Sequence, residues 1–389
     1  MSDRPMLHGI TVLDLASVGP AARASRWLAD YGAQVVTVGP VQKDGAVQIV
    51  PPFHSYGGHR EMQRIRVDLK SDDGTAAFLR LARGADVLIE SFRPGVAVSL
   101  GIGYDAVAAV NPAIVYCSTS GYGQDGPHAQ HAGHDLNYLA IGGFLATTHA
   151  RADGGPPVPG ATVADSAGGG MHGVIAILAA LVRRGATGEG AYLDVAATDG
   201  VLALMSLAVD EYLATGAVPQ PRHGLLTGRY ACYDNYETAD GGWLAVAAIE
   251  PRFWANLCRL LGCERWIEHQ MDDAVQHAVR ADLRAAFATK PRDEWAELLV
   301  AADTCVAPVL SVPELVEHPQ FVARGALVEA EHPTAGPFRQ VGPILAGQRA
   351  PDGPYRLRDA TETDVEQLLR DAGYTNDEIT RLRDAGAVA

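Results

Sequence analysis

The first 120 residues of the sequence alternate between short apolar runs and segments with the period of an α-helix. Residues 10–15 are rich in β-branched side chains, residues 21–31 have helical periodicity, and residues 34–38 are apolar again. Residues 71–83 repeat the helical pattern behind the capping sequence Ser71-Asp72-Asp73, and residues 86–90 and 114–118 repeat the strand pattern. This alternation predicts an α/β fold with a parallel, doubly wound, Rossmann-like sheet that has helices on both faces.

The nucleotide-binding motifs that often accompany such a sheet are missing from the sequence. The segment after the first predicted strand reads ASVGP, without G-x-G-x-x-G, and G-x-x-x-x-G-K-[ST] occurs nowhere in the chain. The glycines of these motifs let the backbone approach phosphate groups closely, so their absence disfavours a dinucleotide-dependent dehydrogenase and a P-loop enzyme.

The length of 389 residues predicts two or three domains, at about 150 residues per domain. Residues 153–160 and 216–224 are rich in glycine and proline and are typical of loops or linkers. Residues 230–243 contain aromatic residues and an Asp240-Gly241 turn, which predicts a hairpin, and helical patterns follow at 253–261 and 294–302. We therefore expect a large α/β domain over residues 1–224, a small α+β domain over 225–330, and a return of residues 331–389 to the large domain.

Charge, apolar runs and cysteines limit the partners and the compartment. The formal net charge of −15 opposes binding to nucleic acid or to an anionic membrane. The N-terminal residues lack the apolar core of a signal peptide, and the apolar run 174–182 is too short to span a membrane, so we expect a soluble, cytoplasmic protein. The five cysteines form no C-x-x-C pair, which predicts reduced thiols and no structural zinc site.

One candidate site is the segment Gly133-His134-Asp135-Leu136-Asn137-Tyr138, which follows the polar loop 121–127. Loops that follow the strands of an α/β sheet are where such proteins build their sites, so His134 is a candidate acid–base group. The alternative is a histidine whose ring makes structural hydrogen bonds. The spacing of His128, His131 and His134 also raises the question of a metal site, but Pro127 and Gly133 interrupt a regular helix there, and we expect no bound metal.

A second candidate is Asp165, in the run ADSAGGG before an apolar helical segment. A carboxylate at a helix N-terminus is stabilised by the helix dipole, and the glycines permit close approach of a ligand. The alternative is a plain N-cap, with the glycines serving helix packing. Glu250, in the run AIEPRF, precedes a predicted helix and by itself is typical of a cap.

These segments together carry a resemblance to a known family. The chain is similar to the family III CoA-transferase superfamily (CaiB/BaiF type) and, within it, to the α-methylacyl-CoA racemases. The resemblance covers nearly the whole chain, including the runs HGITVLDLASVGP, VDLKSDDG, DVLIESFRPGV, AGHDLNYLAIGG, ADSAGGGMHG and YACYDNYETADGGWLAVAAIEPRFW. Its specific part is the GHD-x-NY motif followed by ADxxGGG and later by IEPxF.

The resemblance implies an architecture and a set of roles. Family members form interlocked homodimers, with the active site between the large domain of one subunit and the small domain of the other. In racemases of the family, the residues that match His134 and Asp165 transfer protons, and the residue that matches Glu250 orients the histidine. The matching motifs make other residues candidate contacts of the substrate or of CoA, namely Lys70, Phe92, Arg93, Asp135 and Tyr138. The resemblance implies no metal or redox cofactor. It implies that CoA enters as part of the substrate, an acyl thioester of lipid metabolism.

The resemblance leaves the reaction type open between two branches. Racemisation next to a thioester needs one base on each face of the carbon atom, and His134 with Asp165 would supply that pair. In the transferase branch, the aspartate matching Asp165 is instead a nucleophile that forms an aspartyl–CoA intermediate. The presence of His134 favours the racemase, because acyl exchange does not need a second base. A further possibility is a non-catalytic subunit, which the presence of His134, Asp165 and Glu250 together disfavours.

The sequence departs from the resemblance at positions where relatives carry basic residues for the CoA phosphates. The strand end reads Thr37-Val38-Gly39-Pro40, the pair Met62-Gln63 replaces a basic pair, and Ser99 follows the RPGV run. Phosphates prefer charge-assisted partners. Either neighbouring basic residues replace the missing ones, or the acyl group arrives without free CoA, on a carrier protein or on a molecule without a thioester. The basic residues available for replacement are Arg60, Arg64, Arg66, Lys70 and Arg93.

Overall fold

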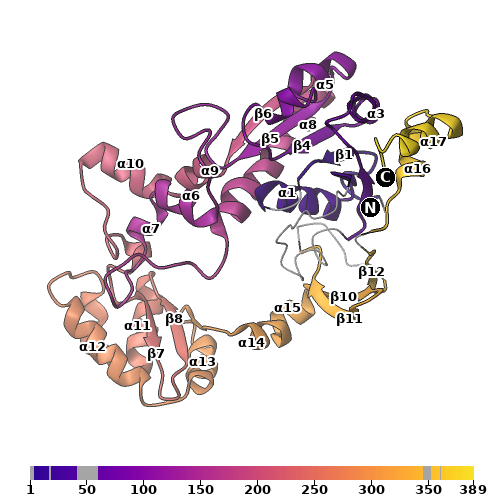
Figure 1. The fold of residues 1–389 in the computed structure, drawn as a ribbon. Helices are drawn as coiled ribbons and strands as arrows, with labels where there is room; N and C mark the ends of the chain where they lie inside the picture. Colours follow the sequence, from indigo (N-terminus) through magenta and orange to yellow (C-terminus); the bar gives the residue numbers. More distant parts are fainter. Residues whose placement is uncertain (1–3, 17–18, 42–59, 345–351, 360) are drawn as a thin grey trace. The chain divides into compact units, whose positions relative to one another are not determined.

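The computed structural model describes residues 4–16, 19–41, 60–344, 352–359 and 361–389 (Figure 1). Its main feature is a six-stranded sheet in the order β3-β2-β1-β4-β5-β6, in which every neighbouring pair is parallel. The strand order reverses between β1 and β4, which creates the switch point at which α/β proteins bind ligands. The strands are β1 (Thr11–Asp14), β2 (Gln34–Gly39), β3 (Gln63–Arg66), β4 (Val87–Glu90), β5 (Val115–Ser120) and β6 (Ala191–Ala196).

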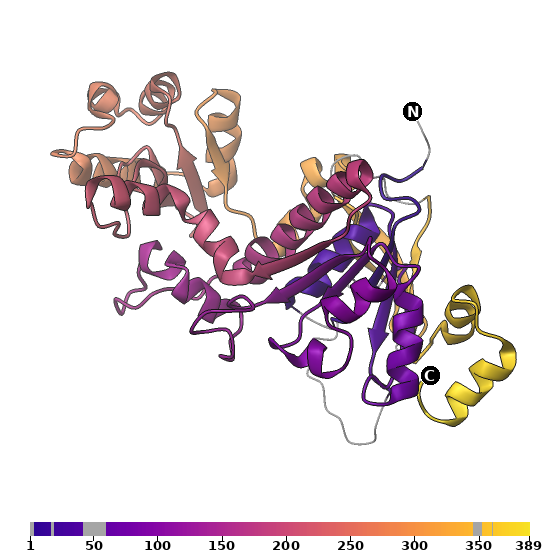
Figure 2. The same cartoon turned by 90° about the horizontal axis from the view of Figure 1, so that it is seen from above.

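Two apolar layers cover the two faces of this sheet, as expected for a doubly wound fold (Figure 2). Successive strand residues point to opposite faces, so Leu13 packs in one layer and Val12 in the other. This is why the strands are continuously apolar. One layer includes α3 (Asp72–Ala82), α4 (Val96–Ser99), α5 (Tyr104–Val110), α16 (Val365–Asp371) and α17 (Asn376–Asp384), and the other includes α1 (Gly19–Asp30) and α8 (His172–Thr187).

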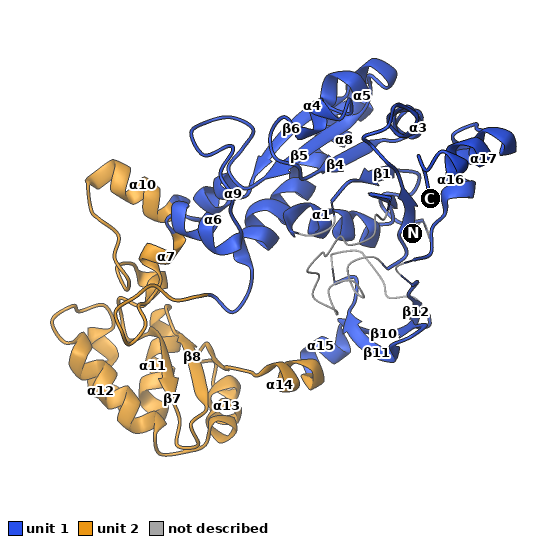
Figure 3. Ribbon diagram, in the orientation of Figure 1, with its two compact units in different colours: residues 1–143, 159–206, 319–389 blue, residues 144–158, 207–318 orange. Residues whose placement is uncertain are grey.

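The chain divides into two compact units (Figure 3). Unit 1 comprises residues 1–143, 159–206 and 319–389, and unit 2 comprises residues 144–158 and 207–318. The expected small domain covered 225–330, so unit 2 begins earlier, ends earlier and includes an additional segment. Unit 1 also contains α6 (Asp135–Ile141), the π-helix η1 (Ala164–Met171), α9 (Ala197–Leu204), α15 (Pro319–Ala323) and a sheet of β10 (Leu327–His332), β11 (Gly336–Val341) and β12 (Tyr355–Arg356).

Unit 2 is built around the predicted hairpin. Strands β7 (Tyr233–Glu237) and β8 (Trp243–Ala247) pair antiparallel, and Gly241 takes the positive φ of 78° that the turn requires. Strand β9 (Val306–Pro308) pairs with β8, and the core contains Trp254, Phe287 and Trp295. The remaining helices are α7 (Phe144–Thr147), α10 (Ser206–Thr215), η2 (Leu225–Thr227), α11 (Pro251–Leu260), η3 (Glu264–His269), α12 (Gln276–Phe287), α13 (Arg292–Ala301) and α14 (Val312–Glu317).

The π-helix η1 continues directly into α8, and glycines let it pack closely on α9. A Cβ on Gly200 would lie 1.8 Å from the Gly168 carbonyl oxygen, and a Cβ on Gly168 would lie 2.7 Å from that of Ala197. The glycine run is therefore required by helix packing. The combined helix Ala164–Thr187 is long and apolar enough to cross a membrane by length and composition, although a single such helix is weak support and the core helix of a soluble protein passes the same test.

Candidate active site

A pocket of about 250 Å³ lies at the carboxyl ends of β4 and β5, in unit 1. Four of the predicted site residues line it, namely Phe92, Arg93, His134 and Tyr138. Phe92 and Arg93 belong to the loop after β4, and His134 and Tyr138 belong to the segment that begins α6. Consecutive parallel strands end at the same edge of a sheet, which is why segments about 40 residues apart in sequence meet here.

His134 occupies the N-cap position of α6 with an exposed side chain. Its backbone N–H donates a hydrogen bond to Asn137 Oδ1 at 3.0 Å, while the imidazole makes no capping hydrogen bond. Among the residues that the structure describes, no capping hydrogen bond holds the imidazole, and the role of His134 as an acid–base group stays a prediction. The ring is available to the pocket that it lines.

His128 and His131 bond to each other and do not join His134. Their Nδ1 atoms lie 2.8 Å apart, which requires one imidazole to donate and the other to accept. Within the part of the chain that the structure describes, no group of three or more His, Cys, Asp or Glu side chains is arranged to hold a metal ion.

Asp165 is the second residue of the π-helix, and the N-cap position belongs to Val163. The interpretation of Asp165 as a plain N-cap is therefore wrong. Its backbone N–H donates to Asp135 Oδ1 at 2.9 Å, which joins the π-helix to the residue next to His134. Single π-helical turns inside longer helices are frequent at functional sites.

The Asp165 carboxyl group is mostly buried, and its Oδ2 lies 3.4 Å from Nη1 of Arg23. Burial raises the pKa of Asp165. The positive charge of Arg23 opposes this rise, the negative charge of Asp135 adds to it, and His134 when protonated opposes it. The charge of His134 therefore affects the pKa of Asp165, although the two residues are 31 positions apart in the sequence.

Tyr138 belongs to the same electrostatic environment. Burial, followed by the charges of Asp165, Tyr122 and Asp135, raises the pKa of its phenol to about 12. The hydroxyl group donates to the Gly133 carbonyl oxygen at 2.5 Å, and the ring packs edge-to-face against Tyr122 at 5.2 Å. Tyr138 is thus a neutral, fixed wall of the pocket at physiological pH.

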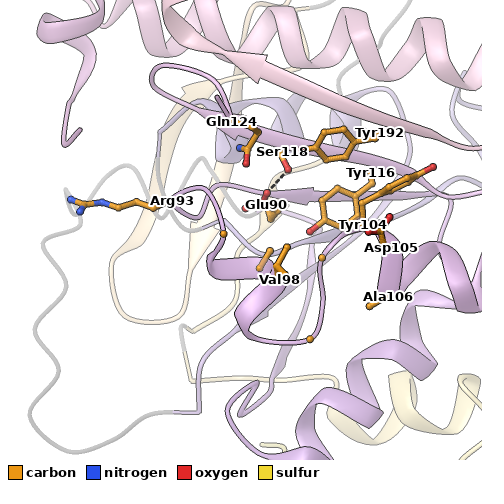
Figure 4. A pocket seen from close by; sticks show the side chains of 14 residues that line it. Glu90, Arg93, Val98, Tyr104, Asp105, Ala106, Tyr116, Ser118, Gln124 and Tyr192 are labelled. Carbon is orange, nitrogen blue, oxygen red and sulfur yellow. Dashed lines mark hydrogen bonds between the residues drawn. The ribbon is translucent and has the colours of Figure 1, made fainter. Parts of the chain in front are cut away.

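A second pocket, of about 390 Å³, shares Arg93 with the first (Figure 4). Its buried acid is Glu90, whose carboxylate accepts hydrogen bonds from the Ser118 hydroxyl and from the Phe92 N–H at 2.7 Å. Burial raises the pKa of Glu90. Three aromatic rings, of Tyr104, Tyr116 and Tyr192, pack on one another along the wall, and Figure 4 shows Arg93 directed away from them.

The remaining predicted residues have different surroundings. Lys70 is exposed in the turn between β3 and α3, where its backbone N–H donates to Asp68 Oδ1. Glu250 belongs to unit 2, where it is the N-cap residue of α11 and its exposed side chain makes no capping hydrogen bond. Its expected role toward His134 therefore remains a prediction.

Two of the arginines expected to replace missing phosphate ligands are engaged within the fold. Arg60 is 2% exposed, donates to Asp30 Oδ1 at 2.9 Å and to the Val341 carbonyl oxygen at 2.7 Å, and lies over the Tyr355 ring. The Arg64 guanidinium donates to the Asp359 carbonyl oxygen at 2.9 Å. The structure thus gives Arg60 and Arg64 structural roles.

The positions that depart from the resemblance also have local partners. The Thr37 hydroxyl donates to the Gln63 carbonyl oxygen at 3.1 Å, Met62 is buried in the apolar layer with α1, and the Ser99 hydroxyl donates to the Val96 carbonyl oxygen at 2.8 Å. Lys70 and Arg93 remain as exposed cations near the carboxyl ends of β3 and β4.

Comparison with known proteins connects this site to a family. The family model described as CoA-transferase family III matches residues 7–358. The chain is 33% identical over 381 residues to the alpha-methylacyl-CoA racemase of Mus musculus, covering 97% of this chain and 96% of the relative. It is 31% identical over 334 residues to the acetyl-CoA:oxalate CoA-transferase of Acetobacter aceti, covering 83% and 85%. The similar proteins therefore include both racemases and transferases.

Two solved structures have a similar fold. A CAIB/BAIF family protein from Brucella suis matches with a TM-score of 0.76 and 25% identity, covering 99% of this chain and 100% of that one. A solved Mycobacterium tuberculosis protein matches with a TM-score of 0.76 and 26% identity, covering 91% and 97%.

Proposed function

Because the chain belongs to CoA-transferase family III, we propose that it is an isomerase that inverts the α-carbon of 2-methylacyl-CoA thioesters by proton transfer. Family membership makes it an enzyme of CoA thioester chemistry, and its similarity to the mouse racemase extends over nearly the whole chain. The choice of racemisation over acyl transfer is our proposal.

The observation that carries the proposal is the hydrogen bond from the Asp165 N–H to Asp135 Oδ1. It fixes the π-helix that bears one proposed base to the residue next to the other, His134. An acyl transfer through an aspartyl intermediate needs no histidine at this place, whereas inversion at carbon needs two proton-transfer groups.

In the proposed mechanism, His134 and Asp165 serve opposite faces of the α-carbon. The deprotonated form of one group, either the Asp165 carboxylate or the neutral His134 imidazole, removes the proton. The electron pair passes to the thioester oxygen as an enolate, and the protonated form of the other group returns a proton from the opposite face. A raised pKa of Asp165 suits this exchange, because the carboxyl group is then less costly to protonate than an exposed aspartate. Acid–base groups of this kind typically contribute about 10² to 10⁴ in rate.

Backbone N–H groups near Asp165 and at Gly168 are candidate donors to the enolate oxygen. The two N–H groups at Asp165 and Ser166 already have other partners. The Asp165 N–H donates to Asp135 Oδ1, and the Ser166 N–H donates to the Thr162 carbonyl oxygen at 3.0 Å. Both N–H groups are therefore engaged within the protein and are not candidate donors to the enolate oxygen.

The second candidate function is CoA transfer with Asp165 as nucleophile. The carboxylate would attack the acyl thioester and release CoA thiolate, and the thiolate would then attack the aspartyl carbonyl of the mixed anhydride to give an aspartyl–CoA thioester and free carboxylate. The 31% identity to an oxalate CoA-transferase favours keeping this alternative. It makes a distinct prediction, a covalent CoA adduct on Asp165.

Deuterium incorporation separates the two functions. In D₂O, the proposed racemase exchanges the α-hydrogen of a single enantiomer of 2-methylacyl-CoA for deuterium and yields both enantiomers. Asp165→Ala and His134→Ala should each reduce the rate of this exchange by about 10² to 10⁴. A transferase instead moves CoA from the acyl thioester to a free carboxylic acid and forms a covalent CoA adduct on Asp165 that mass spectrometry detects. Its activity should be retained in His134→Ala. A protein that catalyses neither α-hydrogen exchange nor CoA exchange with any acyl thioester would support the interpretation as a non-catalytic subunit.

We propose free CoA as the thioester carrier, with Lys70, Phe92, Arg93, Asp135 and Tyr138 as contacts of the substrate. Calorimetric titration with acetyl-CoA tests this directly. Micromolar affinity supports free CoA, and no binding at millimolar acetyl-CoA supports an acyl group on a carrier protein or a substrate without a thioester.

We also propose that the enzyme acts in the cytoplasm as a homodimer. Helix α8 exposes Ile175 and Val182, and α10 exposes Leu207 and Leu213, each with at least 66% of the residue accessible. Covering such side chains favours association. A native mass near 82 kDa, twice the 41.0 kDa of one chain, supports the dimer, and a native mass near 41.0 kDa contradicts it.

A further inference from the structure

Arg23 is a charged side chain that the sequence did not identify as part of the site. It lies in the first turns of α1, and its guanidinium has partners in two segments. Nη1 donates to the Gly19 carbonyl oxygen at 3.1 Å and lies 3.4 Å from Asp165 Oδ2, while Nη2 donates to Thr162 Oγ1 at 2.7 Å. The guanidinium is therefore held in one orientation against Asp165.

The contacts of Asp165 divide its two carboxyl oxygens. Oδ2 faces Arg23, whereas Oδ1 has no hydrogen-bond donor among the residues that the structure describes. The neighbouring Asp135 binds the Asp165 backbone N–H and not its side chain. One oxygen is thus fixed by a cation, and the other remains available to accept a proton.

Several charged groups belong to the elements packed against η1. Asp135 and Tyr138 come from α6, His134 precedes it, and Arg23 comes from α1. The elements α8, α9 and β6 contribute His172, Asp199 and Asp194, of which Asp199 raises the pKa of Asp194. Of the three charges that act most on the pKa of Asp165, Arg23 is the strongest, and it is permanently charged whereas His134 is not.

We propose that Arg23 is a positioning residue that keeps the Asp165 carboxylate ionised and directs its Oδ1 toward the substrate. For the substrate enantiomer whose α-hydrogen faces Asp165, Asp165 is then the proton acceptor and His134 the donor, and for the other enantiomer these roles are reversed. The substrate enantiomer whose α-hydrogen faces Asp165 is the one whose reaction depends on Arg23. This inference rests on the proposed function, because it assigns Asp165 a role in proton removal.

Three variants on α1 test the proposal. Arg23→Gln removes the charge, Arg23→Lys keeps it without the planar guanidinium, and Arg26→Gln is a matched control, because Arg26 lies one turn along the same helix and pairs with Asp30. The readouts are the pH dependence of kcat/KM for deuterium exchange and the carboxyl ¹³C titration of Asp165, with its resonance identified by its loss in Asp165→Asn.

In Arg23→Gln, we expect the acid limb of kcat/KM and the Asp165 titration to move together to higher pH by about 1 pH unit, which is the low end for loss of an adjacent opposite charge. Below this limb, the rate should fall about tenfold. In Arg23→Lys the shift should be at most half as large as in Arg23→Gln, and in Arg26→Gln there should be no shift. Should Arg23→Gln fail to fold, Arg23→Lys carries the test, with a smaller shift in the same direction.

The two readouts separate failure of this inference from failure of the proposed function. A rate that falls equally at all pH values, with an unchanged Asp165 titration, overturns the role of Arg23 and leaves racemisation intact. An enzyme that shows no deuterium exchange, but whose Asp165 titration still moves in Arg23→Gln, retains the ionisation effect of Arg23 and overturns the proton-removal role.

Discussion

Two regions of unit 1 carry arginines that the sequence made equally plausible as phosphate ligands. In the structure, the arginines of the two regions differ in burial and in their partners. Around β3, Arg60 and Arg64 are buried or bonded to the protein, and Arg66 also interacts within the protein. In the loop after β4, Arg93 is exposed and lines two pockets. The same residue type thus stabilises the fold in one region and is available to a ligand in the other.

The C-terminal residues explain the difference. The Asp364 carboxylate accepts the Arg64 backbone N–H at 2.8 Å, Val388 bridges to Val67, and the Arg60 guanidinium stacks on Tyr355. These contacts cover the β3 region with chain from the far end of the sequence. In the loop after β4, Arg93 is exposed and lines two pockets, so its side chain can take part in chemistry.

The largest expected effect is the loss of activity when a proposed proton-transfer group is removed. Asp165→Asn and His134→Ala should each reduce deuterium exchange by about 10² to 10⁴, because each removes a proton-transfer group. His8→Ala, at an exposed histidine near the N-terminus, is the control and should leave the rate unchanged. A His134→Ala enzyme that keeps full exchange would remove the β5 loop from the chemistry.

The next largest expected effect is a difference in stability between variants of the buried Arg60 and of the exposed Arg93. Arg60→Met leaves the buried Asp30 with one cation fewer and should lower the free energy of unfolding by about 3 kcal/mol. The same substitution at the exposed Arg93 should change it by less than about 0.5 kcal/mol. Urea denaturation of both variants measures the contrast, and equal losses would mean that burial does not distinguish the two arginines.

The sequence predicts the elements that local patterns determine. The continuously apolar strands β1, β2, β4 and β5 follow from burial on both faces, and Ser71 caps α3 as expected, accepting the Gly74 N–H at 3.0 Å. Strand β3 was not predicted, because its sequence QRIR is polar and its residues obtain their partners from β2 and the C-terminal segment.

The site is predicted less completely, for a related reason. His134, Phe92, Arg93 and Tyr138 were identified through motifs and share a pocket. The π-helix at Asp165 was not predicted, because it depends on how glycines pack against α9 and not on a local pattern. Arg23 was also missed, because its partner is 142 positions away in the sequence.

Asp14 tests what burial does to a carboxyl group. It ends β1 and is 1% exposed. Its Oδ1 accepts the Ala16 N–H at 2.8 Å, and among the residues that the structure describes Oδ2 has no hydrogen-bond partner. Burial raises the pKa of Asp14 to about 7.

Because the pKa of Asp14 is higher in the folded state than in the unfolded state, its contribution to stability is fully present below pH ~4 and is lost as the pH rises toward 7. Between pH 5 and pH 7, wild-type protein should therefore lose about 2 kcal/mol more than Asp14→Asn does. Denaturation at both pH values measures this difference, and parallel pH dependences would show that Asp14 is ionised in the folded protein.

The smallest expected effect concerns the exposed cations. Lys70→Ala and Arg93→Ala should each weaken binding of CoA about tenfold, since one charge-assisted contact to a phosphate contributes roughly 1.5 kcal/mol. Neither variant should change the free energy of unfolding, because neither side chain is buried. Calorimetric titration with CoA and with dephospho-CoA measures the losses and shows which residue contacts the 3′-phosphate.

Substitution of a residue that contacts the 3′-phosphate should weaken binding of CoA but not of dephospho-CoA. If both variants bind CoA as wild type does while Arg66→Ala does not, the phosphates lie at β3, and the division between a structural and a ligand-binding region fails at its outer strand.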